Sequence, residues 1–319
     1  MNVLVIGGSA CGMKAASRIR RLNPDARITV VEQGHYVSYA GCGLPYHVKG
    51  TVRNLYDLVK TTHGAVRDPA YFEAVKDITV LTHTRAEAID RERTAVQVRD
   101  LRGGHTRELP YDKLVLATGA SPVRPPIEGT ELKGVHCLTT LEDARALAQA
   151  VAQKERGSVV IIGASFIGME AAEAFGEHGW EVTLVEKFGQ VFPNALDFEI
   201  AAALHEHLFE QMVETEFDSE VVRIEGDEDG NVSKVLTRGD ELDADLVILA
   251  VGVRPNIEIA KAAGLEIGQT GALAVNEHMQ TSDPNIYAGG DLVENKNLLT
   301  ARPCYIPLGS TANKHGRVI

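Results

Sequence analysis

The sequence contains no apolar run of the roughly 18 residues that a membrane-spanning helix needs, so no membrane partner is expected. It begins MNVLVIGGSACG, without the basic segment and small-residue cleavage site of a signal peptide. Positive charge is also scarce, because 32 Lys and Arg against 44 Asp and Glu give a formal net charge of −12. Nucleic acids bind through clustered cations, so they are not expected as partners either. We predict a cytoplasmic protein.

Cysteine is scarce as well, and its spacing excludes the common cysteine-rich sites. The four cysteines are Cys11, Cys42, Cys137 and Cys304, and no two are close enough for a CxxC zinc knuckle or a CxxxxC dithiol. His-Glu-His at 205–207 lacks the i, i+4 spacing of a helical zinc pair. We therefore predict no metal site, and in a reducing compartment no structural disulfide. Each cysteine needs its own explanation.

What the sequence does contain is an internal repeat. The segment VLVIGGSACGMKAASRI near the start is matched by VVIIGASFIGMEAAEAF, 156 positions later. The recurring loop positions are Gly7 and Gly12 in the first copy and Gly163, Ser165 and Gly168 in the second. Each copy has the pattern of a strand, a glycine turn, a helix and a second strand, which is a βαβ unit.

Each copy also ends its second strand on an acid, Glu32 in the first and Glu186 in the second. A glycine turn presents the N–H groups of a helix N-terminus to a pyrophosphate, and an acid about 20 residues further on accepts hydrogen bonds from a ribose. Serine replaces the middle glycine of G-x-G-x-x-G in both copies, which weakens each match taken alone. Two copies with every other part in place predict two dinucleotide sites.

The remaining segments complete a coarse map. Alternating residues around polar turns predict β-hairpins at 94–110 and 221–238. Glycines follow three further predicted strands, at Thr118–Gly119, Gly252 and Gly290–Asp291. We predict an α/β protein with two Rossmann-like dinucleotide-binding domains. One comprises residues 1–112 and 245–319, and the other, residues 113–244, is inserted into it.

With these residues collected, the chain resembles the pyridine nucleotide–disulfide oxidoreductases, flavoproteins with a glutathione-reductase-like fold. The resemblance covers essentially all 319 residues and rests on both glycine loops with their acids, on LATG and on YAGGD. It implies FAD in the first domain, at Gly7, Gly12, Glu32 and Asp291, and NADH in the inserted domain, at Gly163, Gly168 and Glu186. Further cofactor-binding positions are Gly8, Thr118, Gly119, Ser165, Glu170, Gly252 and Gly290.

The preference between the two nicotinamide cofactors follows from the second acid. Glu186 would repel a 2′-phosphate, which favours NADH, whereas Lys187 beside it leaves NADPH open.

The stretch SYAGCGLPY, residues 38–46, is similar to the S-[FY]-x-x-C motif of the single-cysteine branch of this family. That branch contains coenzyme A disulfide reductases, NAD(P)H oxidases, NADH peroxidases and persulfide reductases, and the continuation GLPY is most similar to the first and last of these. Peroxidase-like members have a histidine where this chain has Ala10, which counts against peroxide as the natural oxidant. The resemblance implies that Cys42, beside the flavin, reduces coenzyme A disulfide or a related small disulfide or persulfide.

From the residues alone, Cys42 is either a nucleophile or a buried structural thiol. A helix N-terminus lowers the pKa of a cysteine to ~4–7, and Gly43 and Pro45 suit a short helix starting directly after Cys42. Flanking glycines and the polar Ser38 disfavour a packed apolar site. We therefore favour the interpretation of Cys42 as a nucleophile. Cys11, Cys137 and Cys304 are expected to be structural.

Three residues are candidates for substrate binding. Arg18 and Arg21 lie three apart on one face of the first predicted helix. The resemblance implies that this surface helps to bind the nucleotide end of coenzyme A, and a solvated basic helix face is the alternative. Ser38 would either orient the substrate or cap a turn.

Relatives in this branch continue into a C-terminal dimerisation domain, and nothing in this sequence corresponds to it. We expect the chain to bind both cofactors, with the family's homodimer weakened or absent and with low activity. Two other functions stay open. One is an NADH oxidase or peroxidase in which Cys42 cycles through sulfenic acid. The other is an NADH-dependent electron-transfer reductase of a small redox protein.

Overall fold

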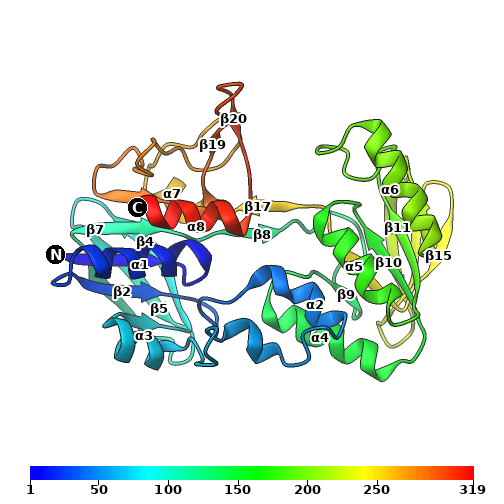
Figure 1. Ribbon diagram of the computed structural model, residues 1–319, viewed down its shortest axis with the longest axis horizontal. Helices are drawn as coiled ribbons and strands as arrows, with labels where there is room; N and C mark the ends of the chain where they lie inside the picture. The colour runs from blue at the N-terminus through cyan, green and yellow to red at the C-terminus, as the bar shows by residue number, and fades with distance from the viewer. The chain divides into compact units, whose positions relative to one another are not determined.

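The computed structural model describes residues 1–319, which divide into two compact units (Figure 1). The first unit comprises Met1–Ala40, Tyr56–Ser121 and Arg254–Ile319, and the second comprises Gly41–Leu55 and Pro122–Val253. None of the helices is both long and apolar enough to cross a membrane.

The first unit is built on a five-stranded parallel sheet with strand order β18-β7-β1-β2-β3. Its strands are β1 (Asn2–Ile6), β2 (Arg27–Val31), β3 (Thr79–Leu81), β7 (Lys113–Leu116) and β18 (Ile286–Ala288). The helices α1 (Ala10–Leu22), α3 (Pro69–Lys76) and α8 (Gly309–Val318) belong to the same unit, and α8 packs along α1 (Figure 1).

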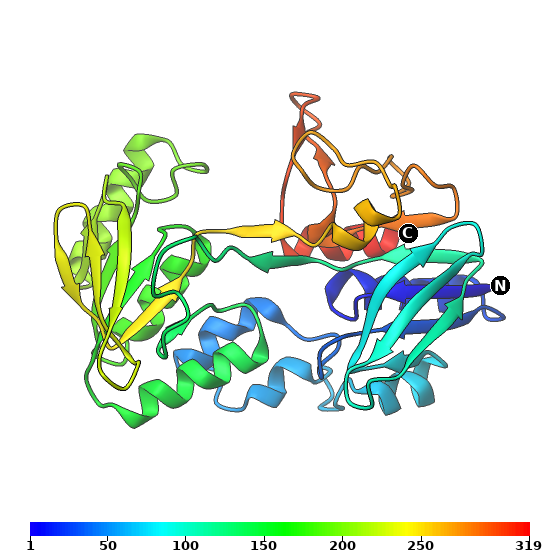
Figure 2. The ribbon, with the colours of Figure 1, turned by 180° about the vertical axis from the view of Figure 1, so that it is seen from behind.

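Both faces of this sheet are buried, which explains its almost continuous apolar strands. Val3 and Val5 of β1 share a core cluster with Met13 of α1, whereas Leu4 and Ile6 point to the opposite face. That face is covered by an antiparallel sheet of β4 (Thr84–Asp90), β5 (Ala95–Asp100) and β6 (Thr106–Pro110), seen well in Figure 2. The hairpin predicted at 94–110 is confirmed by the pairing of β5 with β6.

The second unit repeats this plan. Its five-stranded parallel sheet has the order β12-β11-β10-β16-β9. The strands are β9 (Val135–His136), β10 (Ser158–Ile162), β11 (Glu181–Val185), β12 (Val213–Glu216) and β16 (Leu246–Leu249). The helices are α2 (Leu44–Val48), α4 (Leu141–Gln153), α5 (Phe166–Gly176) and α6 (Phe198–Glu210). An antiparallel sheet of β13 (Val221–Gly226), β14 (Val232–Thr237) and β15 (Glu241–Asp243) packs on the parallel one, so the hairpin predicted at 221–238 is confirmed.

The shorter elements complete the chain. They are the 3₁₀ turns η1 (Gly41–Gly43), η2 (Leu55–Val59) and η3 (Gly290–Leu292), the helix α7 (Glu258–Ala262), and the strands β8 (Ala120–Pro122), β17 (Val253–Pro255), β19 (Asn295–Lys296) and β20 (Pro303–Cys304).

Capping side chains explain where two of the helices start. The Asp68 carboxylate accepts the Tyr71 N–H at 2.8 Å and Pro69 occupies the first turn, which together begin α3. Thr140 and Asp143 form a reciprocal capping box at the start of α4.

The boundaries of the units differ from the residue pattern's prediction of breaks after residues 112 and 244. The strand β7 pairs with β1 and therefore belongs to the first unit, which continues to Ser121. The strand β16 pairs with β10, and the second unit continues to Val253. Residues 41–55 also belong to the second unit, because α2 packs against α4 and α5.

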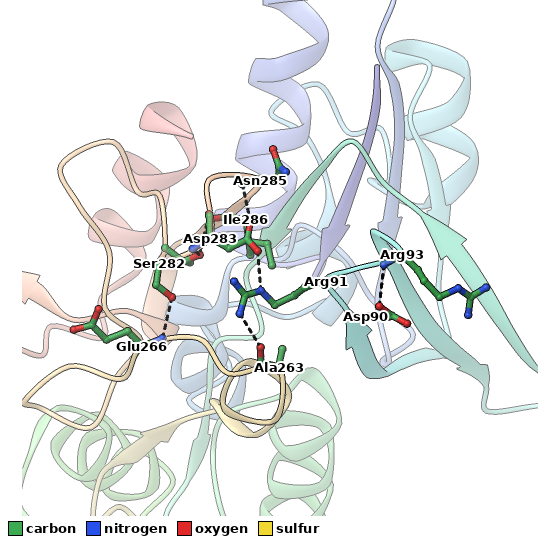
Figure 3. A network of polar contacts seen from close by, with 10 residues as sticks. Asp90, Arg91, Arg93, Ala263, Glu266, Ser282, Asp283, Asn285 and Ile286 are labelled. Atoms are coloured by element: carbon green, nitrogen blue, oxygen red, sulfur yellow. Dashed lines mark hydrogen bonds and ion pairs between the residues drawn. The ribbon is translucent and has the colours of Figure 1, made fainter.

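A network of polar contacts holds the β4–β5 turn to distant parts of the first unit (Figure 3). The Arg91 Nε donates to Asp283 at 2.7 Å, and its Nη1 donates to the Ala263 carbonyl oxygen at 3.3 Å. The other Asp283 oxygen accepts the Asn285 N–H at 2.9 Å. Burial alone would raise the pKa of Asp283, but these hydrogen bonds and the Arg91 charge outweigh it and hold the pKa below its ordinary value.

Replacing Asp283 by alanine should lower the free energy of unfolding by about 1–3 kcal/mol, because it leaves the Arg91 Nε and the Asn285 N–H without their acceptor. Since the folded-state pKa is depressed, the stabilisation is present at neutral pH and is lost as the pH falls below about 4. Denaturant unfolding of the unaltered chain and of Asp283→Ala, at neutral and at acidic pH, measures this stabilisation. The control is Glu108→Ala, which removes an exposed pair with Arg93 and should cost less than about 1 kcal/mol. Equal costs would contradict this account.

Candidate active site

The first glycine loop joins β1 to α1, and its geometry admits only glycine at two positions. Gly7 has φ +105°, a conformation that L side chains rarely adopt, and a Cβ there would collide with the Ala117 carbonyl oxygen. A Cβ on Gly12 would collide with the Gly7 carbonyl oxygen. Ser9 makes no side-chain cap at the start of α1, so the N–H groups of its first turn receive no acceptor from the cap.

The acid predicted to bind a ribose lies beside this loop. The two oxygens of Glu32 accept hydrogen bonds from the N–H groups of Gly8 and Gly34, both at 2.7 Å. Each carboxylate oxygen has a second lone pair, so Glu32 can still accept a ligand hydroxyl. The acid therefore fixes the loop and remains available to a ligand.

The second glycine loop, between β10 and α5, has the same construction. Gly163 has φ +106°, and a Cβ on Gly168 would collide with the Gly163 carbonyl oxygen. The Glu186 carboxylate is buried, and it accepts the Ala164 N–H at 2.8 Å and the N–H two residues after itself at 3.1 Å. Ser165 is exposed and, like Ser9, makes no side-chain cap. The sequence repeat is thus a repeat of the whole loop and acid arrangement.

The other residues assigned to this second site are near its loop or after its neighbouring strand. Glu170 lies on α5, where burial first and the Glu173 charge second raise the pKa of its carboxyl. Gly252 follows β16 with φ +100°.

In the first unit, Thr118 and Gly119 follow β7. The Thr118 hydroxyl donates to the Asn256 carbonyl oxygen at 2.9 Å, and the Asn256 side chain donates back to the Thr118 carbonyl oxygen at 2.8 Å. Gly119 has φ +65°.

Asp291, in η3, has a buried Oδ1 atom without any hydrogen-bond partner. Burial raises the pKa of this carboxyl. Its neighbours are fixed, because the Tyr305 hydroxyl donates to the Asp291 carbonyl oxygen at 2.7 Å and the Gly290 N–H donates to Nδ1 of His315 at 3.2 Å. A buried acceptor without a partner costs about 1–3 kcal/mol, so this atom fits a ligand that brings a hydroxyl donor.

Cys42 lies in η1, directly before α2, and is exposed. The short helix predicted after it is present at Leu44–Val48, with Gly43 at its N-cap. The segment is held to α5 by Lys49, whose Nζ contacts Glu173 at 2.8 Å and Glu177 at 3.2 Å. An exposed thiol does not fit a packed structural role, and the nucleophilic role of Cys42 stays a prediction.

The other cysteines are in different surroundings. Cys137 is buried directly after β9, and Cys304 is half-buried in β20. Cys11 is buried, and desolvation together with the Asp291 charge raises the pKa of its thiol to about 12, which keeps it protonated.

A pocket of about 410 Å³ opens on the first unit between α1, α3 and the loops beside them. No acidic residue lines this pocket. Four cations do, and they are Lys14, Arg21, Arg67 and Lys76. Ser38 also lines it, so two of the three residues assigned to the substrate lie here. The third, Arg18, is not part of the lining. The pattern of the first helix could have indicated Lys14, but only the fold brings Arg67 and Lys76 beside it.

None of these four cations forms an ion pair within the protein. Arg67 is held by the Leu58 and Val59 carbonyl oxygens at 3.2 and 3.3 Å. Burial first, and then the charges of Arg21 and Lys14, lower the pKa of Lys76. Uncompensated positive charge in a protein of net charge −12 marks a site for an anionic ligand.

Comparison with known proteins shows which family has this architecture. The model of the pyridine nucleotide-disulphide oxidoreductase family matches residues 1–316. The NAD(P)H sulfur oxidoreductase (CoA-dependent) of Pyrococcus abyssi is 40% identical over 316 residues, which are 99% of this chain and 68% of that protein. The NADH oxidase of Methanocaldococcus jannaschii is 37% identical over 318 residues, covering 100% of this chain and 69% of that protein.

A solved structure shows the same likeness. The NAD-dependent persulfide reductase from A. fulgidus superposes with a TM-score of 0.96 at 48% identity, covering 100% of this chain. The chain spans 58% of the length of that persulfide reductase.

The chain belongs to the pyridine nucleotide-disulphide oxidoreductase family. The predicted fold class, two Rossmann-like units in an α/β protein, is confirmed, and so is the predicted class of enzyme, an oxidoreductase of this family. The residues of the first unit fit FAD. The tight glycine loop, the spare lone pairs of Glu32 and the unpartnered Asp291 oxygen suit the pyrophosphate and hydroxyl groups of that cofactor.

Valine at either loop position should weaken nucleotide binding at one proposed site and preserve it at the other. Gly12→Val forces side-chain atoms into the Gly7 carbonyl, and an overpacking cost of about 1–3 kcal/mol corresponds to a roughly 5- to 150-fold loss of affinity. We expect Gly12→Val to be purified with little flavin, and Gly168→Val to keep its flavin but to bind NADH weakly. Flavin absorbance and NADH titration measure the two losses. Loss of flavin from Gly168→Val would show that the sites are not separable as described.

Proposed function

We propose that the chain is an FAD-dependent NAD(P)H oxidoreductase that reduces coenzyme A disulfide or a related small disulfide or persulfide through Cys42. The observation that carries this proposal is the pocket lined by Lys14, Arg21, Arg67 and Lys76, because its charge supports an anionic substrate. The coenzyme A dependence of the Pyrococcus abyssi relative supports the same substrate class.

Coenzyme A suits this pocket because its nucleotide end carries several phosphate groups. Arginine binds phosphate bidentately and lysine binds it as a point charge, and both occur here. Since Arg67 is held by backbone carbonyls, its guanidinium is oriented before a ligand arrives. Ser38 lines the pocket and is the first residue of the segment that leads to Cys42, so we assign it to orienting the substrate.

Cys42 is assigned the chemical step. Its thiolate attacks one sulfur of the substrate disulfide, a bond forms between the two sulfur atoms, and one coenzyme A leaves as its thiolate. FAD, when bound, supplies the two-electron chemistry by which NADH reduces the resulting disulfide. Gly7, Gly8, Gly12, Glu32, Thr118, Gly119, Gly290 and Asp291 would hold it.

The second unit is assigned to NADH. Gly163, Ser165 and Gly168 would receive the pyrophosphate and Glu186 the ribose, with Glu170 and Gly252 at the edges of the site. The cytoplasmic location and the weakened homodimer stay predictions.

Cys42→Ser separates this function from an electron-transfer reductase. NADH should reduce the flavin of the variant as it does in the unaltered chain, because neither nucleotide site includes Cys42. Coenzyme A disulfide should then leave the flavin reduced in the variant and reoxidise it in the unaltered chain, as measured by flavin absorbance without oxygen. Reoxidation of the variant by coenzyme A disulfide would refute the role of Cys42. Reoxidation by oxygen, but not by the disulfide, in the unaltered chain would favour an NADH oxidase.

Arg21→Gln and Lys76→Gln test the pocket. Each removes a cation that faces the proposed phosphates, so the concentration of coenzyme A disulfide that gives half-maximal flavin reoxidation should rise about tenfold. The response to a small uncharged disulfide should stay unchanged. Arg107→Gln, an exposed arginine of β6 outside the pocket, makes the same charge change and should have no effect on either substrate. Equal effects of the three variants would contradict the role of the pocket, because the change in net charge would then be the cause.

A further inference from the structure

The carboxyl end of β11, where Glu186 lies, has strongly acidic surroundings. The loop after β12 runs beside it, because the Ser219 N–H donates to the Glu186 carbonyl oxygen at 3.1 Å and the Glu186 N–H donates to the Glu216 carbonyl oxygen at 2.8 Å. That loop reads EFDSE at 216–220 and so adds three carboxylates to that of Glu186. These carboxylates would repel a further negative charge at this end of the sheet.

Two cations also lie here, and one carboxylate engages both. The Lys187 Nζ contacts Oε1 of Glu220 at 2.6 Å, and the Arg238 Nη2 contacts Oε2 at 2.5 Å. The side chain of Glu220 is 31% exposed, against 63% for Lys187 and 75% for Arg238. The hydrogen bond from Lys187 and the charge of Arg238 hold the pKa of Glu220 below its ordinary value, so it is ionised at neutral pH.

We propose that Glu220 is a specificity residue that reserves the second nucleotide site for NADH by engaging Lys187 and Arg238. This inference rests on the proposed NADH site. The two cofactors differ only by the 2′-phosphate of the adenosine ribose, and the acid after the second strand of the βαβ unit is the group that meets that ribose. A 2′-phosphate would therefore approach Glu186 and its acidic neighbours, while the two nearby cations are already compensated by Glu220.

Glu220→Gln is the direct test, because it keeps the shape of the side chain and removes its charge. The two freed cations should tighten binding of 2′,5′-ADP and of NADPH about five- to tenfold at low ionic strength, where exposed charges are little screened. Binding of 5′-AMP and of NADH should change less than about twofold, since neither carries the 2′-phosphate. Isothermal titration calorimetry with the four nucleotides measures this directly, without turnover.

The matched control is Glu241→Gln. Glu241 pairs with Lys234 at 2.9 Å on the exposed β14–β15 hairpin, so its replacement changes the net charge equally and also frees a lysine of the second unit. It should leave the affinity ratio of 2′,5′-ADP to 5′-AMP unchanged. Adding Lys187→Gln to Glu220→Gln should remove most of the gain.

An unchanged ratio in Glu220→Gln, with normal NADH binding, would overturn this inference alone. An equal rise in Glu241→Gln would also overturn it, because net charge would then be the cause. If the unaltered chain bound no NADH, the proposed function itself would fail and this inference with it.

Discussion

The hydrogen bond between the acid after the second strand and the backbone of the glycine loop is the interaction on which the rest of the structure depends. Glu32 accepts the Gly8 N–H and Glu186 accepts the Ala164 N–H, at 2.7 and 2.8 Å. Each bond fixes a loop whose glycines already admit no side chain, and each acid keeps a lone pair for a ligand. Because the same arrangement is built twice on separate parallel sheets, the two proposed nucleotide sites have independent scaffolds.

The pocket proposed to bind the substrate depends on a different interaction, the local concentration of positive charge in an acidic protein. Its four cations form no internal ion pairs, and a bound anion would offset both the burial and the repulsion by Arg21 and Lys14 that lower the pKa of Lys76. The second unit shows the reverse situation, since Glu220 compensates Lys187 and Arg238. Whether a cation is already compensated thus distinguishes the surface proposed to accept phosphates from the one proposed to reject a 2′-phosphate.

Much of this could be predicted from the sequence where the signal is local. The two βαβ units, both hairpins and the helix after Cys42 follow from spacing and turn chemistry within short segments. Arg67 and Lys76 could not be predicted, because tertiary packing brings them to the pocket: Lys76 lies at the end of α3, and Arg67, before that helix, is held by the Leu58 and Val59 carbonyl oxygens. The assignment of residues 41–55 to the second unit was missed for the same reason, since it depends on contacts such as Lys49 with Glu173 on α5.

The most direct test of the central claim, that electrons from NADH leave the protein through Cys42 to a coenzyme A disulfide, is the intact mass of the chain with its flavin bound. After treatment with coenzyme A disulfide, the account predicts one coenzyme A adduct, located on Cys42 by peptide mapping, which disappears when NADH is added without oxygen. An adduct on another cysteine, no adduct, or an adduct on Cys42 that NADH does not remove would contradict the account.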